Sequence, residues 1–201
     1  MIRQLYGTAE SAPGSLNWRL KVSQLEAARR IGRFTGGVVI TAVFLIAIGD
    51  AFGLLISNTD SAAPVGLYRV TSDEPQRDDL VAACLPIAIA QEGLTRGYLR
   101  TGPCPGNAEP VGKILGALPG DTVRIESNAI SVNGVRFARS AVAGRDNAGR
   151  PLHHVSFGKY RVSPDQVWLF GFNDRRSWDS RYFGPIPLAN VRGRIEPILT
   201  W

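Results

Sequence analysis

The sequence predicts a mostly β domain attached to one N-terminal transmembrane helix. Three observations predict this class. A basic N-terminal segment is followed by a long apolar stretch, the remainder is made of short alternating segments separated by turn residues, and the chain contains no internal repeat or low-complexity tract. With 201 residues, the chain has room for one domain of ordinary size besides the anchor.

Residues 1–33 carry most of the net positive charge. The formal net charge of the chain is +6, and this segment contributes +4 of it. A basic excess beside an apolar span is a topology signal, which places residues 1–33 in the cytoplasm. Because no basic run interleaves with aromatic side chains, we predict that nucleic acid is not a partner.

The apolar stretch TGGVVITAVFLIAIGDAFGLLI runs from Thr35 to Ile56. Its length of about 22 residues is enough to cross a bilayer as a helix, and we place the transmembrane anchor at residues 34–56. Asp50 lies in the last third, where a carboxylate is tolerated near the headgroups. A buried helix of a soluble protein and a cleavable signal peptide remain alternatives. A single-pass anchor in the inner (cytoplasmic) membrane would leave residues 57–201 as a periplasmic domain.

The first part of this outer domain begins with a predicted strand at residues 66–70, GLYRV, and a second at residues 79–86. The alanine-rich segment at residues 87–98 predicts a short helix. Residues 99–112 are rich in Pro and Gly, which predicts a loop.

The second part alternates polar and apolar side chains over residues 122–137, with a hairpin turn signal at Asn133–Gly134. This pattern predicts a β meander. Residues 138–160 are polar and weakly patterned, and we assign them no element. Strands follow at residues 165–171 and at residues 191–201.

The two cysteines, Cys84 and Cys104, both fall on the outer side of the predicted membrane. An even count in an oxidising compartment favours one disulfide, which would close a loop of about 20 residues and contribute roughly 3 kcal/mol. Two free thiols are the alternative. Since no histidine lies near them, we predict no metal site, and nothing in the chain calls for a cofactor.

Ser61 and Lys113 are the two residues best placed for chemistry. Ser61 follows the apolar span closely, where the anchor would hold it at the membrane surface. The chain has only three lysines among its 23 basic residues, and Lys113 lies in the apolar segment GKILGALPGD. Burial in such a strand would depress the pKa of its amine, so that a neutral Lys113 could accept a proton from a serine hydroxyl. A lone lysine in a strand is also commonly a surface residue.

A third segment, GFNDRRSWDSRYFGP at residues 171–185, gathers polar and charged side chains among aromatics. It predicts either a turn with local ion pairs or one wall of an active site. In the second interpretation, Ser177 hydrogen-bonds the Lys113 amine and Asp179 pairs with Arg181 to fix the segment.

These motifs resemble the signal peptidase family with a Ser-Lys dyad, and most of all its conjugative-transfer branch, the TraF-type peptidases. The span is followed at once by TDSAAPVGLYRV, GKILGALPGD is similar to the family's K-R-x-x-G-x-P-G-D box, and the third segment is similar to G-D-N-x-x-x-S-x-D-S-R. The motifs also come in the family's order and cover roughly 45 residues. The resemblance implies a signal-peptidase-like β-sheet catalytic domain.

The resemblance also implies roles for individual residues. Ser61 matches the nucleophile and Lys113 the general base. Thr59 matches the position whose hydroxyl helps the backbone amide of the nucleophile to form the oxyanion hole. Asp179 matches the aspartate required in the conjugative branch, and the supporting positions are Ser177 and Arg181.

The implied activity is that of a membrane-anchored serine endopeptidase that cuts after small residues. Its partners would be the lipid bilayer and a pilin precursor or another signal-peptide-bearing protein, which the conjugative branch can also cyclise. One departure leaves an alternative open. Many members of that branch have the serine two residues before the proline, and here that residue is Ala62. In that alignment the chain is an inactive signal-peptidase-like protein acting in the assembly of a conjugation or secretion apparatus.

Two further alternatives are weaker. A cytoplasmic Ser-Lys self-cleaving repressor would share the dyad, but the apolar span and the lack of a helix-turn-helix signal argue against it. A Ser-His-Asp triad would need His153 or His154, which lie in a polar stretch with nothing that ties them to a serine.

Overall fold

The computed structural model describes residues 37–38, 41, 54–57, 62–174 and 176–201. The chain divides into two compact units, Met1–Ile48 and Gly49–Trp201. The predicted membrane span lies mostly outside the described residues, among which no helix has the length and apolar character needed to cross a membrane. Its C-terminal boundary is wrong, because Leu54–Ile56 belong to strand β1 (Leu54–Ser57), whose backbone pairs with a neighbouring strand.

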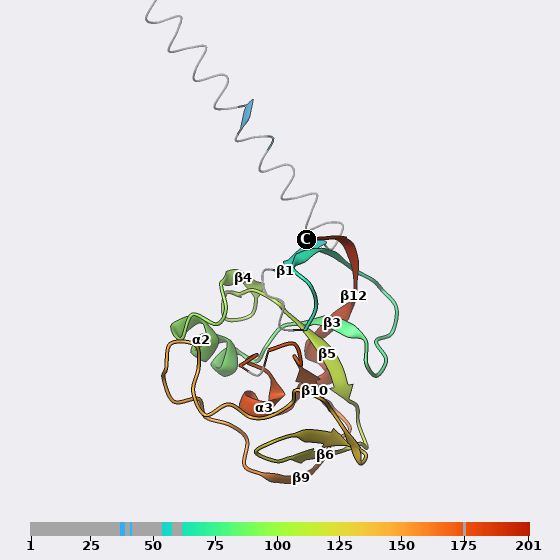
Figure 1. The fold of residues 1–201 in the computed structure, drawn as a ribbon. Helices are drawn as coiled ribbons and strands as arrows, with labels where there is room; N and C mark the ends of the chain where they lie inside the picture. Colours follow the sequence, from blue (N-terminus) through green and yellow to red (C-terminus); the bar gives the residue numbers. More distant parts are fainter. Residues whose placement is uncertain (1–36, 39–40, 42–53, 58–61, 175) are drawn as a thin grey trace, which may run out of the picture. The chain divides into compact units, whose positions relative to one another are not determined.

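The mostly β prediction is confirmed. Seven strands form one sheet in the order β1-β2-β12-β3-β5-β10-β11, and every neighbouring pair is antiparallel. The strand that comes last in the sequence therefore lies in the interior of the sheet, between two strands from the first part (Figure 1). The bounds are β2 (Gly66–Val70), β3 (Leu80–Ala83), β5 (Val111–Ala117), β10 (Gln166–Phe170), β11 (Ile186–Pro187) and β12 (Val191–Thr200).

A second, four-stranded sheet has the order β8-β7-β6-β9. It contains the predicted meander, in which Asn133 and Gly134 join two strands with φ angles of 51° and 86°. Two consecutive positive φ angles are typical of a type I′ hairpin turn, which Asn-Gly favours. The strands are β6 (Thr122–Ile125), β7 (Ile130–Val132), β8 (Val135–Arg136) and β9 (Gly158–Arg161).

Helices are few among the described residues. The predicted short helix is α2 (Ile87–Thr95), and α3 (Ser180–Phe183) and the 3₁₀ helix η1 (Leu188–Asn190) follow late in the chain. The predicted loop at residues 99–112 is wrong in part, because it contains β4 (Thr101–Cys104) and the start of β5. β4 makes only isolated bridges to Ala108, so the missing backbone N–H of Pro103 does not interrupt a continuous ladder of hydrogen bonds.

The disulfide predicted between Cys84 and Cys104 is present, with Cα atoms 5.4 Å apart. It joins the end of β3 to β4 across helix α2, so the helix is enclosed in a covalent loop between cysteines that are 20 positions apart. The helix lies beside the large sheet (Figure 1), and Ala90 packs in the same buried cluster as Val81 and Leu115.

A second buried cluster joins the two sheets. Alternation in β6 and β7 turns their apolar side chains toward Trp168 and Phe170 of β10, and all of them are buried. Gly116 allows this packing, since a Cβ there would lie 2.2 Å from the Phe170 ring. The apolar members from the small sheet are Val123, Ile125, Ile130 and Val132.

Candidate active site

Lys113 occupies the middle of β5, between β3 and β10 in the large sheet, and lies opposite Val81 of β3. Its side chain is only 6% exposed. Burial lowers the pKa of the amine to about 8, although the nearby Asp179 carboxylate acts in the opposite direction. A lysine amine in water is half neutral only near pH 10.5, whereas the Lys113 amine is half neutral near pH 8.

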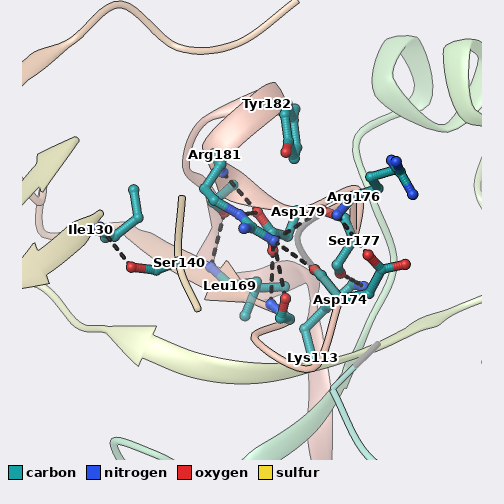
Figure 2. Close-up of polar contacts among 12 residues, drawn as sticks. Lys113, Ile130, Ser140, Leu169, Asp174, Arg176, Ser177, Asp179, Arg181 and Tyr182 are labelled. Atoms are coloured by element: carbon teal, nitrogen blue, oxygen red, sulfur yellow. Dashed lines mark hydrogen bonds and ion pairs between the residues drawn. The ribbon is translucent and has the colours of Figure 1, made fainter. Parts of the chain in front are cut away.

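The segment after β10 folds back over this lysine. Ser177 is buried, its backbone N–H donates to the carbonyl of Asp174 at 3.0 Å, and its hydroxyl accepts a hydrogen bond from Lys113 Nζ at 2.7 Å (Figure 2). This is the contact that the sequence predicted. A fixed hydroxyl at this distance orients the amine.

Asp179 and Arg181 form the predicted ion pair, with Oδ2 and Nη2 2.7 Å apart and both side chains 0% exposed. The carboxylate also accepts the backbone N–H of Gly171 at 2.8 Å, and as the N-cap of α3 it accepts the N–H of Arg181 at 3.0 Å. Asp179 thus ties the start of the segment, just after β10, to the helix that ends it.

The Arg181 guanidinium extends this framework to four backbone carbonyls (Figure 2). The one that matters most is the carbonyl of Ser177, at 3.2 Å from Nη2, because it fixes the residue that contacts Lys113. The planar guanidinium can hold several acceptors in fixed directions, which a lysine amine cannot. The remaining acceptors are the carbonyls of Ala141, Gly171 and Asp174.

Sequence reasoning missed two contributors in this region. The Ser180 hydroxyl is buried and accepts the N–H of Leu169 in β10 at 2.9 Å, and the Tyr182 hydroxyl accepts the N–H of Ala143 at 3.0 Å. Ser180 lies inside the D-S-R part of the motif, which is a signal that could have identified it. The Tyr182 contact spans 39 residues and has no local signal.

Ser61 and Thr59 lie outside the described residues. The loop that contains them connects β1 to β2, which pair through Ser57 and Gly66. In the described part of this loop, two backbone carbonyls accept hydrogen bonds from residues outside it. The buried Tyr68 hydroxyl donates to Pro64 O at 2.6 Å, and the backbone N–H of Trp201 donates to Val65 O at 3.1 Å.

Among the described residues, no three His, Cys, Asp or Glu side chains gather in a way that could hold a metal ion. The groups brought together around Lys113 suit proton transfer. A desolvated amine is oriented by one hydroxyl, and the segment that carries this hydroxyl is fixed by a buried ion pair.

Comparison with known proteins identifies the family. Residues 28–201 match the family described as signal peptidase, peptidase S26. The plasmid transfer protein TraF of Escherichia coli is 33% identical over 178 residues, which cover 87% of this chain and 99% of that protein. The probable conjugal transfer protein TraF of Sinorhizobium fredii (strain NBRC 101917 / NGR234) is 37% identical over 185 residues, 89% of this chain and 96% of that protein. A crystal structure of a signal peptidase I from Enterococcus faecalis V583 covers 62% of this chain and 98% of its own, with 25% identity and a TM-score of 0.37. The chain therefore belongs to the signal peptidase family, peptidase S26.

Proposed function

We propose that this member of the signal peptidase family is a membrane-anchored serine endopeptidase with Ser61 as nucleophile and Lys113 as general base. The observation that carries the proposal is the buried Lys113 amine. Its pKa is lowered to about 8, and it is held by Ser177 at 2.7 Å. An exposed lysine, with a pKa near 10.4, would have a neutral fraction at neutral pH that is smaller by roughly a hundredfold or more.

In the proposed reaction, neutral Lys113 Nζ takes the proton of the Ser61 hydroxyl while the oxygen attacks a peptide carbonyl. The backbone N–H of Ser61 and the Thr59 hydroxyl stabilise the oxyanion, each donor contributing about 3–4 kcal/mol. The lysine then gives its proton to the leaving amine as the C–N bond breaks, which leaves an acyl-enzyme. Water releases the acyl group by hydrolysis, and an amine of the same substrate chain would release it as a cyclic product.

The setting follows from the predicted anchor. With residues 1–33 in the cytoplasm and a single span in the inner membrane, the peptidase unit faces the periplasm, where it meets substrates that are themselves membrane-tethered. Two relatives covered almost completely are named as transfer proteins TraF, which favours a precursor used in conjugation, such as a pilin, cut after small residues. The chemistry needs no cofactor.

A second candidate function rests on one observation in the sequence. Ala62, not Ser61, stands two residues before Pro64. If Ala62 occupies the place of the nucleophile, the chain is a signal-peptidase-like protein that acts in the assembly of a conjugation or secretion apparatus without cleaving a substrate.

Cleavage of a pilin precursor or a signal-peptide substrate by the purified full chain separates the two functions. Ser61→Ala and Lys113→Ala should each reduce the rate by at least about 10³-fold, as losses of a nucleophile or its base do in serine peptidases. The matched controls are Ser72→Ala and Lys159→Ala, which change exposed residues and should retain activity. Full activity in Ser61→Ala would contradict the proposal, and an inactive wild type would favour the assembly function.

A further inference from the structure

A row of cations crosses one face of the four-stranded sheet. Lys159 of β9 lies opposite Arg124 of β6, Arg124 opposite Ser131 of β7, and Ser131 opposite Arg136 of β8. Residues directly opposite one another in antiparallel strands project from the same face. These four side chains, with three cations among them, are called the basic row below.

The basic row lies on the outer face of this sheet. Arg124, Arg136 and Lys159 are exposed, whereas the residues that alternate with them in β6 and β7 are buried against β10. Arg161, two residues beyond Lys159 and also exposed, adds a fourth cation to the same face, opposite Thr122.

Few counter-charges balance the basic row. In the part of the chain that the structure describes, the one carboxylate that reaches it belongs to Glu126, at 3.8 Å from Arg124, and no ion pair forms with Arg136, Lys159 or Arg161. Cβ atoms of directly opposite residues are only about 4.5–5.5 Å apart, and like charges in such pairs are destabilising. The Lys159–Arg124 pair therefore opposes folding of the sheet, and a function outside the fold would account for it.

We propose that the basic row and Arg161 form a docking face for an extended acidic segment of a partner protein. Carboxylates on such a segment would replace the missing counter-charges, with bidentate hydrogen bonds to the arginines. Alternate side chains of an extended chain are about 6.6–7 Å apart, and the long stems of Arg and Lys can follow this spacing.

One observation favours an acidic protein over a lipid surface. The cations share their face with the small polar residues Ser131 and Thr122, whereas peripheral membrane binders combine cations with large apolar side chains.

Binding of a fluorescent oligoglutamate peptide to the purified full chain, followed by anisotropy at low and at physiological salt, tests the proposal. The triple variant R124Q/R136Q/K159Q should bind roughly tenfold more weakly, because each exposed charge pair contributes up to about a factor of five. The affinity of the wild type should fall as salt is added. The control R100Q/R145Q/R192Q removes the same charge from exposed arginines elsewhere and should bind like the wild type.

Three results would overturn the proposal. The first is that the wild type does not bind the peptide. The second is that the triple variant and its control lose equal affinity. The third is that the wild type binds only phosphatidylglycerol vesicles, or only duplex DNA, when these are offered in place of the peptide.

Thermal unfolding adds an independent readout. Lys159→Gln should raise the unfolding temperature because it relieves repulsion from Arg124. A lower unfolding temperature would contradict the proposal, because it would mean that Lys159 stabilises the fold through contacts within the chain. Neither readout depends on Ser61 or Lys113, so a failure here leaves the proposed peptidase function standing.

Discussion

Two clusters in this domain use an aspartate and a nearby arginine, but in different surroundings. In the site cluster, formed by Lys113, Ser177, Asp179 and Arg181, both members of the ion pair are 0% exposed. In the Tyr98 cluster, formed by Tyr98, Asp146, Arg96 and Arg150, the carboxylate is buried but Arg150 is 43% exposed.

The two clusters differ in which of their ionisable side chains are shielded from solvent. The site cluster places three ionisable groups in the interior, where the charged form of each is costly unless its partners are present. The Tyr98 cluster keeps both of its cations in partial contact with water. It fastens the turn around Asp146 to the end of α2, with Asp146 Oδ2 accepting from Tyr98 at 2.6 Å and from Arg150 at 2.7 Å. An Asp–Arg ion pair thus fixes the segment that contacts Lys113 in one cluster and a surface turn in the other. Four substitutions test this difference between the clusters.

The largest effect is expected from Asp179→Asn. It leaves the Arg181 guanidinium buried without a counter-charge, which should reduce the free energy of unfolding by about 3–5 kcal/mol. Chemical unfolding of the purified full chain measures the loss. The control Asp165→Asn changes an exposed aspartate and should be neutral. An equal loss in the two variants would mean that burial of the pair has no special cost.

Lys113→Met should have the opposite effect on stability, because it removes a buried amine whose charged form is costly in the folded protein. The pKa in the folded protein, about 8, is below the ordinary 10.5, so between these values the unfolded chain binds more protons and the stability of the wild type rises with pH. A shift of this size opposes folding by about 3 kcal/mol at pH 7, and loss of the Ser177 hydrogen bond offsets about 1 kcal/mol of the gain. The variant should therefore be about 2 kcal/mol more stable at pH 7, with no advantage above pH 10. A difference that does not change with pH would refute this account.

Asp146→Asn should cost less than Asp179→Asn, because Arg96 and Arg150 can turn to water. Hydrogen bonds from Tyr98, then from the backbone and side chain of Arg150, lower the pKa of the Asp146 carboxyl. Its contribution is therefore present above the ordinary pKa of an aspartate, about 4, and is lost as the pH falls below that value. Unfolding midpoints of wild type and variant should converge as the pH is lowered from 6 to 3. Curves that stay parallel over this range would exclude such a role.

The smallest effect is expected from Tyr98→Phe. It removes one donor to Asp146 while the ring keeps its packing against Trp178, at a centroid distance of 5.3 Å. The expected loss is about 1 kcal/mol, because Asp146 retains its other donors. Thermal unfolding measures it, and a loss as large as that of Asp179→Asn would erase the contrast between the two clusters.

Local patterns predicted the parts of the site that lie close together in the sequence. The apolar neighbours Ile114 and Leu115 indicated that Lys113 is buried, and the order of residues in the third motif indicated the contacts of Ser177 and Asp179. The Asn133–Gly134 turn was predictable for the same reason, since its backbone angles depend on those two residues.

Contacts between distant segments left no such signal. The position of β12 between β2 and β3 depends on pairing across more than 100 residues, and Tyr98 meets Asp146 across 48. β9 was missed because only one of its four residues, Tyr160, places an apolar side chain in the core, and a single residue cannot show the alternation that predicts a strand. α3 was missed because its single turn begins at an aspartate that the motif assigned to chemistry.

The strand order also has a consequence for how the protein is made. The hairpin β1–β2, whose loop contains Ser61, and the pair β3–β5, which carries Lys113, are joined in the sheet by β12. Because β12 is formed by residues 191–200, a growing chain has both halves of the proposed dyad long before it has the strand that joins them. If Ser61 and Lys113 form the proposed dyad, the sheet that joins their strands is complete only when synthesis is almost finished, and a chain that ends before β12 lacks the strand between them.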